Sequence, residues 1–127
     1  MEWKYVKNIN ENEIVEVEKK YNINLPESLK NIILKYNGGR PDRRIFDTTT
    51  SKERVIKSLI SYSDKDKENI HIFSDFFKRG YIPFAITPFG DVLCMKKGEK
   101  IYILMHETDE FDYVCNNLDE FFKKLYK

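Results

Sequence analysis

Apolar side chains recur every three or four residues in the first part of the chain, whereas later segments alternate or run continuously. Within residues 25–36 this spacing predicts a helix with one buried stripe. Pro26 suits the first helical turn, where its missing N–H is not needed. We expect Asn37, Gly38 and Gly39 to end the helix, because Asn and Gly accept a left-handed backbone. A helix of this kind requires a sheet or a second helix to cover its stripe.

An earlier helix is predicted from Asn10 or Asn12 to Tyr21, since either Asn suits the N-cap position. The short connector to the next helix predicts a helical hairpin. In the middle of the chain the sequence predicts a strand over 43–47, a turn over 48–52, a strand over 54–62 with helix as the alternative, a polar loop over 63–68, and a third helix from Ile70 to Arg79–Gly80.

The second half of the chain has the character of β-structure. Strands are predicted over 81–87, 91–96 and 100–106, with a turn over 88–91 and a tight hairpin link over 97–99. A polar loop over 107–112 and a short apolar segment over 113–115 follow. Asn116 or Asn117 then caps a last helix, whose buried face is expected to contain Leu118, Phe121, Phe122, Leu125 and Tyr126.

This order of elements predicts the α+β class. The expected architecture is a largely antiparallel sheet, with a meander over about 82–115, packed with an N-terminal helical hairpin, a middle helix and a C-terminal helix. The chain has 127 residues and 41% hydrophobic residues, which suits one domain over 1–127.

The charge balance and the apolar runs restrict the partners of the chain. Lys and Arg number 22 against 21 Asp and Glu, for a net charge of +1, which argues against a dedicated nucleic-acid binder. No apolar run matches a secretory signal or a membrane span, so we expect neither direct nucleic-acid binding nor membrane association. Cys94 and Cys115 lie in apolar segments, which favours buried free thiols and a cytoplasmic location.

The motifs of known catalysts are missing from the sequence. It contains no G-x-S-x-G, no P-loop and no G-x-G-x-x-G, so we expect no enzymatic activity and no cofactor. The candidate metal ligands His71, His106, Cys94 and Cys115 lack the spacing of a metal site. We interpret the cysteines as packing residues and the histidines as half-exposed side chains.

Several short motifs, taken in order, resemble the SUKH superfamily, which includes yeast cell-wall-assembly regulators and many bacterial immunity proteins. They are Leu25-Pro26, Asn37-Gly38-Gly39, Ile82-Pro83-Phe84-Ala85, Gly90-Asp91, Leu93-Cys94-Met95, His106-Glu107, and Phe121-Phe122 with Leu125. We expect structural roles for Leu25, Pro26, Asn37, Gly38, Gly39, Pro83, Gly90 and Asp91.

The resemblance implies an immunity protein that binds the C-terminal domain of a polymorphic or contact-dependent toxin and blocks it by stoichiometric occlusion. A nuclease is the toxin class that the resemblance favours. The alternatives are a non-catalytic regulatory or scaffold module, and a small-ligand-binding module with a pocket between the sheet and the first two helices. The sequence predicts a monomer or a weak homodimer, because an exposed edge strand is the one feature that favours pairing of two copies.

An acidic run near the C-terminus is the first candidate partner surface. No Lys or Arg lies between Lys100 and Lys123. The candidate residues are Glu107, Asp109, Glu110, Phe111, Asp112, Tyr113, Asp119 and Glu120. We hypothesise that they form an acidic and aromatic surface that covers the basic active face of a nuclease. A solvated loop followed by carboxylates at a helix N-terminus is the alternative.

A basic cluster forms the second candidate surface. It consists of Arg40, Arg43 and Arg44 beside Asp42. Arginine forks suit an acidic or phosphate group. The simpler interpretation is a solvated turn with a local Arg–Asp ion pair, which would contribute little to stability.

Overall fold

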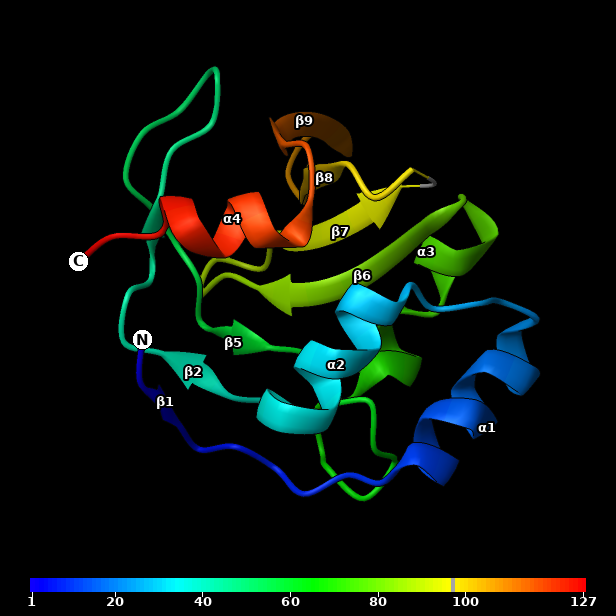
Figure 1. Ribbon diagram of the computed structural model, residues 1–127. Coiled ribbons are helices and arrows are strands. Elements are labelled where there is room, and N and C mark those ends of the chain that lie inside the picture. Colours follow the sequence, from blue (N-terminus) through cyan, green and yellow to red (C-terminus); the bar gives the residue numbers. More distant parts are fainter. Residues whose placement is uncertain (97) are drawn as a thin grey trace.

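The computed structural model describes residues 1–96 and 98–127 (Figure 1). Lys97, the first residue of the predicted hairpin link over 97–99, lies outside the described residues. The described chain forms an α+β fold, as the sequence predicts. Within residues 1–96 and 98–127, no helix is both long and apolar enough to cross a lipid bilayer.

A five-stranded antiparallel sheet forms the centre of the fold, with the strand order β5-β6-β7-β8-β9. Its strands are β5 (Ser58–Leu59), β6 (Tyr81–Ile86), β7 (Val92–Lys96), β8 (Ile101–Met105) and β9 (Glu110–Cys115). Two short antiparallel ladders lie beside it: β1 (Trp3–Lys4) with β2 (Arg40–Pro41), and β3 (Ile45–Phe46) with β4 (Arg54–Val55). The predicted meander is therefore confirmed.

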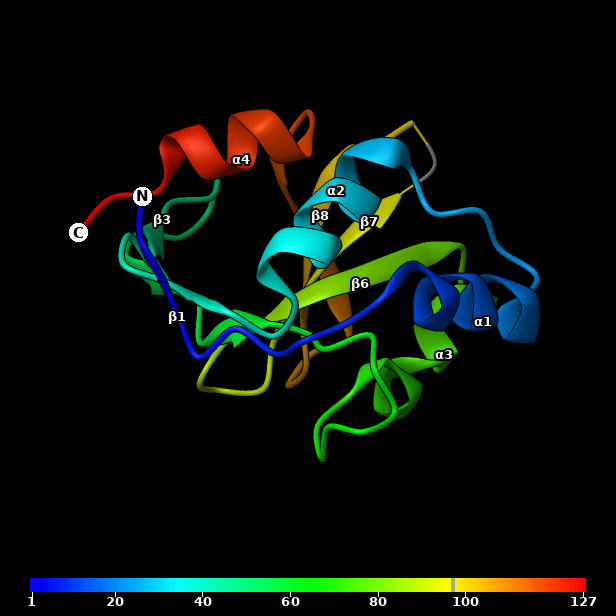
Figure 2. The same cartoon turned by 60° about the horizontal axis from the view of Figure 1, so that its bottom comes forward.

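The helices are α1 (Glu11–Tyr21), α2 (Glu27–Tyr36), α3 (Asp75–Lys78) and α4 (Leu118–Lys124), together with the 3₁₀ helix η1 (Ile70–Phe73). The side chain of Asn10 caps α1 and that of Asn117 caps α4 by accepting a backbone N–H in the first turn. Figure 2 shows α2 and α4 on one side of the sheet and α3 on the other.

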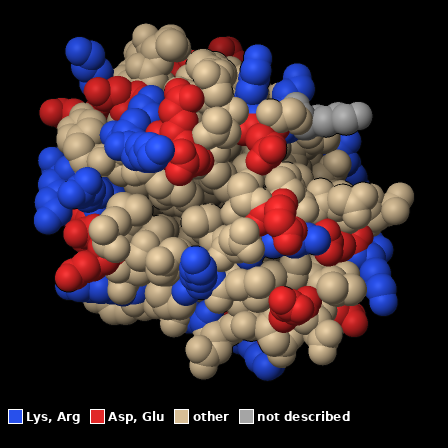
Figure 3. Space-filling model, viewed as in Figure 1, with Lys and Arg blue, Asp and Glu red and all other residues tan. Residues whose placement is uncertain are grey.

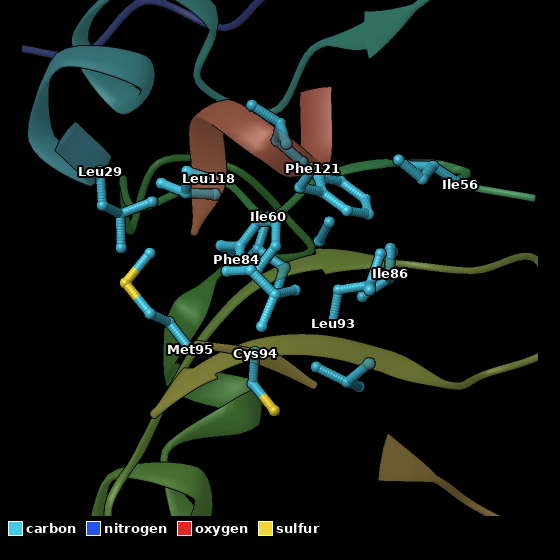
Figure 4. Close-up of a cluster of buried hydrophobic side chains, with 14 of the residues drawn as sticks. Leu29, Ile56, Ile60, Phe84, Ile86, Leu93, Cys94, Met95, Leu118 and Phe121 are labelled. Atoms are coloured by element: carbon cyan, nitrogen blue, oxygen red, sulfur yellow. The ribbon is translucent and has the colours of Figure 1, made fainter. Parts of the chain in front are cut away.

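The main core lies between the sheet and the helices α2 and α4. The Phe121 ring of α4 packs edge-on against Phe84 of β6 and against Phe46 of β3, with ring centroids 5.7 and 5.5 Å apart. Cys94 points away from α4, whereas Phe84 points toward it (Figure 4). This alternation follows from the pleat of the strands and gives the sheet two buried faces.

Four expectations require correction. The segment 54–62 is not one strand, because Arg54–Val55 pairs with β3 and Ser58–Leu59 pairs with β6. The third helix is divided at Ser74 into η1 and α3. The predicted loop over 107–112 is wrong, since the turn is confined to 106–109 and Glu110 already begins β9. Tyr126 is 38% exposed and does not belong to the buried face of α4.

Candidate protein-binding surfaces

The buried Asn37 accounts for one position of the Asn37-Gly38-Gly39 motif. Its side chain is 1% exposed. The Nδ2 group donates to Ser61 Oγ at 3.0 Å, and the backbone N–H of Tyr62 donates to Asn37 Oδ1 at 2.8 Å. Asn37 therefore connects the end of α2 to the segment after β5. Its φ of −46° is not left-handed, which corrects the expectation for this residue.

The two glycines of the same motif are favoured at their positions for different physical reasons. Gly38 has a φ of +67°, which L side chains rarely adopt. At Gly39, an added Cβ would lie 2.8 Å from the carbonyl oxygen of Tyr36 and 3.2 Å from the Trp3 ring. Gly39 therefore lets the N-terminal segment approach α2, and Trp3 stacks on Tyr36 there with ring centroids 4.5 Å apart.

The Leu25-Pro26 motif at the start of α2 also has a structural explanation. Leu25 is buried in the core, and Pro26 occupies the N-cap position of α2, one residue before the first helical residue.

Pro83 lies on β6 opposite Cys94, next to a register shift between Pro83 and Ala85. The buried Tyr62 hydroxyl donates to the carbonyl oxygen of Pro83 at 2.7 Å, so a side chain from the segment after β5 fixes the strand next to this register shift.

Asp91 is a buried carboxylate that joins two turns. Its Oδ1 accepts the backbone N–H of His106 at 3.0 Å and lies 2.7 Å from His106 Nδ1. Its Oδ2 lies 3.4 Å from Arg54 Nη1. Gly90 has a φ of +92°, which L side chains rarely adopt, and it lies against the His106 ring. The Gly90-Asp91 and His106 motifs therefore form one cluster that holds the β6–β7 turn against the end of β8.

Aromatic side chains cluster where β9 meets β8 and β6. Phe111 stacks on Tyr81 with centroids 4.0 Å apart and planes 10° apart. Tyr102 packs edge-on against both Tyr81 and Tyr113, at 6.0 and 5.8 Å. The guanidinium of Arg79 lies 4.9 Å from the Phe111 ring centroid. We call Tyr81, Tyr102, Phe111 and Tyr113 the aromatic cluster. All four side chains are partly exposed.

The acids of the first candidate surface are distributed along β9 and beyond both of its ends. Arg79 forms an ion pair with Asp109, with Nη1 3.0 Å from Oδ1. Asp112 Oδ2 accepts the hydroxyl of Thr50 at 2.6 Å. Asp119 pairs with Lys123 one turn along α4, at 2.9 Å. Among the described residues, Glu107, Glu110 and Glu120 have no ion pair.

Strand alternation divides the acids of β9 from its aromatic residues. Phe111 and Tyr113 pair with Leu104 and Tyr102 on one face of the sheet, so Glu110 and Asp112 lie on the other face. The sequence suggested one mixed surface. The structure instead places the two kinds of side chain on either side of an edge strand, where a partner that meets the edge contacts both.

The opposite end of β9 is also electronegative. Partial burial raises the pKa of the Tyr113 hydroxyl above its ordinary value, and the negative charge of Glu120 adds to that effect. Tyr113 also donates a hydrogen bond to the Asn116 side chain. The negative charge of Glu120, which belongs to α4, therefore acts on the aromatic cluster through Tyr113.

The basic cluster begins on β2, which Figure 1 shows apart from β9. Arg40 belongs to β2, and its cross-strand partner is Lys4 of β1. Asp42 does not pair with the neighbouring arginines, because its carboxylate accepts the backbone N–H of Glu2 at 3.1 Å and lies 3.7 Å from Lys127 Nζ. The simpler interpretation, a local Arg–Asp pair, is therefore wrong.

The candidate metal ligands do not converge. No group of three or more His, Cys, Asp or Glu side chains among the described residues has the arrangement of a metal site. Cys94 and Cys115 are free and buried, as predicted. Burial raises the pKa of both thiols, that of Cys115 to about 11, so both are protonated at neutral pH. His71 instead shares a hydrogen bond with the Tyr21 hydroxyl.

The ligand-binding alternative places a pocket between the sheet and the first two helices, but the hollow beside β6 and β7 is lined by the connector between α1 and α2, by the end of α3 and by those two strands, and by no residue of α1 or α2. It encloses about 300 Å³ and is lined by Ile23, Asn24, Pro26, Phe77, Gly80, Tyr81, Ile82, Lys96, Gly98 and Glu99. Asn24, Lys96 and Glu99 are the polar side chains of its lining among the described residues. Tyr81 is shared with the aromatic cluster, so the hollow adjoins the first candidate surface.

Sequence reasoning missed Arg79, Tyr81 and Tyr102 as members of the first surface, and Lys4 and Tyr5 as neighbours of the second. The signal for Tyr81 and Tyr102 was the alternation along the strands, which places them on the face of Phe111 once the register is known. Arg79 lies at the end of α3, outside any strand, and had no such signal. Nothing in the sequence indicated that the first residues would pair with residues 40–41.

Comparison with known proteins identifies the family of this chain. Curated proteins include no match to this chain. A family model does match it over residues 8–124, which is nearly its whole length, and the matched family is known for immunity proteins. The motifs described above fall inside this span except for Leu125, which lies one residue beyond it. The chain therefore belongs to the SMI1 / KNR4 family (SUKH-1).

Proposed function

We propose that this chain is an immunity protein of the bacterial cytoplasm that binds the C-terminal domain of a polymorphic or contact-dependent toxin. It neutralises that domain by stoichiometric occlusion and has no catalytic role of its own. The observation that supports this proposal is family membership over residues 8–124, combined with an acidic and aromatic edge strand. We further propose a nuclease as the toxin, since a basic nucleic-acid-binding face complements the acids along β9.

The two faces of β9 suit two parts of such a complex. Glu107, Glu110 and Glu120 lack ion pairs among the described residues and supply long-range attraction that speeds encounter. The aromatic cluster supplies the rigid, partly exposed rings that act as anchors in protein interfaces. A protective complex requires nanomolar affinity or better, about −12 kcal/mol, over an interface of roughly 1,600 Å².

A regulatory or scaffold module is the alternative function, and partner capture separates the two. A tagged copy of the chain is expressed in its native cell under conditions in which toxins are produced, and the captured proteins are identified by mass spectrometry. We expect one near-stoichiometric partner with a small C-terminal domain, and co-expression of the chain should rescue cells from that domain. Several weak partners without toxicity would instead favour the scaffold module.

Charge reversal then tests the surface itself. Glu110→Lys changes an exposed acid that has no ion pair, and we expect roughly tenfold slower association with the toxin domain and a weaker dependence on salt. Glu16→Lys on α1 is the matched control, because it makes the same charge change at an exposed helix position remote from β9. Equal association rates for the two variants would exclude β9 while leaving the immunity function intact.

A further inference from the structure

The ladder of β1 and β2 borders a second hollow, of about 320 Å³, lined by Lys4, Tyr5, Arg40, Pro41, Asp42 and Arg44. We call it the basic hollow. On the face drawn in Figure 3, blue side chains gather at the left margin beside a few red ones, where Figure 1 places β1, β2 and both termini. Three of the six lining side chains are cationic, against one carboxylate.

These cations are uncompensated within the part of the chain that the structure describes. Among the described residues, Lys4, Arg40 and Arg44 form neither an ion pair nor a side-chain hydrogen bond. The one carboxylate, Asp42, is already engaged by Lys127 and by the backbone of Glu2. The basic hollow therefore presents uncompensated positive charge.

Two local features at the basic hollow are unfavourable on their own. Lys4 and Arg40 are direct cross-strand partners, and like charges directly opposite each other destabilise a ladder. Tyr5 has a φ of +60°, a left-handed conformation that is strained for an aromatic residue, and its side chain is 69% exposed. Such departures from local preference concentrate at functional sites. A bound anion would relieve the repulsion between Lys4 and Arg40.

The frame around the basic hollow holds it in place. Trp3 stacks on Tyr36 of α2, and the backbone N–H of Asp42 donates to the carbonyl oxygen of Glu2 at 2.9 Å. The ladder is thereby fixed on both sides of Lys4 and Arg40. Lys4 and Tyr5 precede the family match, which begins at residue 8, whereas Arg40, Asp42 and Arg44 lie within it.

We propose that the basic hollow binds a nucleoside phosphate, with its phosphates on Lys4, Arg40 and Arg44 and its base on the Tyr5 ring. Arginine forks match phosphate oxygens, and an exposed aromatic ring stacks on any nucleobase. The volume is at the lower end of small-ligand pockets, which suits one nucleotide. A long nucleic acid binds along an extended basic surface, and domains that bind one are usually strongly basic. The net charge of this chain is +1, which favours a single nucleotide over a long nucleic acid.

The test is isothermal titration calorimetry of the full chain with ADP, pyrophosphate, adenosine and an oligothymidylate. We expect ADP to bind more tightly than pyrophosphate or adenosine. Arg40→Gln with Arg44→Gln should weaken ADP binding roughly tenfold or more, because two charged hydrogen-bond donors are lost. Tyr5→Ala should weaken ADP binding about fivefold but leave pyrophosphate binding unchanged, since it removes only stacking.

The matched control is Lys19→Gln with Lys35→Gln, which removes two exposed charges from α1 and α2 and should leave ADP affinity unchanged. Circular dichroism verifies that each variant is folded. The proposal is overturned if ADP produces no binding heat, if pyrophosphate binds as tightly as ADP, if the two arginine substitutions change nothing, or if oligothymidylate binds far more tightly than ADP. None of these outcomes bears on toxin binding at β9, which lies elsewhere on the fold.

Discussion

At the scale of single residues, the motif positions are explained by buried polar groups and close backbone approaches. Asn37 is almost completely buried, yet both ends of its amide are bonded. Asp91 is buried and joins His106 to Arg54. Residues of this kind are constrained by the fold and leave no free group for a partner. We therefore expect them to serve the fold rather than the binding of a partner.

Asn37→Ala is expected to lower the free energy of unfolding by about 2 kcal/mol, because it leaves the N–H of Tyr62 buried without an acceptor. Urea denaturation followed by circular dichroism measures the change. Asn31→Ala, at an exposed position of α2, is the control and should alter stability by only a few tenths of a kcal/mol. Equal stability of the two variants would show that the Asn37 bonds contribute nothing.

His71 makes the stability of the fold depend on pH. Partial burial lowers its pKa below the ordinary value of 6.5, and the positive charge of Lys20 lowers it further, while Asp64 opposes the change. The unfolded chain therefore binds a proton more readily than the folded chain as the pH falls through 6.5. The stabilisation from His71 is complete above that pH and is lost below it.

We expect the free energy of unfolding to decrease between pH 7.5 and pH 5, a range that lies above the titration of Asp42 and Asp47, whose pKa values are lowered from 3.8. In His71→Gln the decrease should be smaller. Urea denaturation at several pH values supplies the comparison. An identical pH dependence in both proteins would assign the effect to other groups.

At the scale of elements, long periodic segments could be predicted and short ones could not. The apolar stripe over residues 25–36 specified α2, and the runs over 81–106 specified β6, β7 and β8. The run over 54–62 is equally rich in β-branched residues, but it serves two ladders because β4 and β5 pair with different strands. Composition indicates a strand and does not say which neighbour will accept its hydrogen bonds.

The candidate surfaces show the same limit. The acidic run over 107–112 was visible in the sequence, but its polarity indicated a loop where an edge strand is found. An edge strand is solvated on one side and tolerates charges that an inner strand would exclude. The basic hollow depends on a two-residue ladder between β1 and β2, which is too short to produce any period. Contacts between distant short segments therefore escaped prediction.

The cap of α4 links β9 to the core helix. Asn117 Oδ1 accepts the backbone N–H of Glu120 at 2.8 Å. Asn117→Ala is expected to destabilise the fold by about 1 kcal/mol, and Asn117→Asp should retain most of the stability because the carboxylate also accepts this bond. Thermal unfolding measured by calorimetry compares the two. Equal losses would mean that the amide group, and not the acceptor oxygen, is what matters.

At the scale of the whole molecule, the five-stranded sheet has one protected edge and one exposed edge. Strand β5 is short, and the N–H of Leu59 donates to the carbonyl oxygen of Gly39 at 2.9 Å, which covers that side. Strand β9 has six residues, and within residues 1–96 and 98–127 no further strand pairs with it. A long open edge favours association of two copies unless charges oppose it. Glu110 and Asp112 occupy that edge.

Two copies related by a two-fold axis would pair β9 with itself in antiparallel orientation, which brings the acids of one copy against those of the other. We therefore expect the chain to be monomeric or only weakly dimeric at low salt. Glu110→Thr with Asp112→Thr removes the repulsion and introduces residues that favour strands, so self-association should become about tenfold tighter. Sedimentation velocity over a range of protein concentrations measures it. The control is Glu11→Thr with Glu16→Thr, which removes two exposed acids from α1 and should leave the chain as it was. Should the β9 variant stay as monomeric as the control, the charges on this edge would not be what keeps it open, and their remaining role would be the attraction of a basic partner.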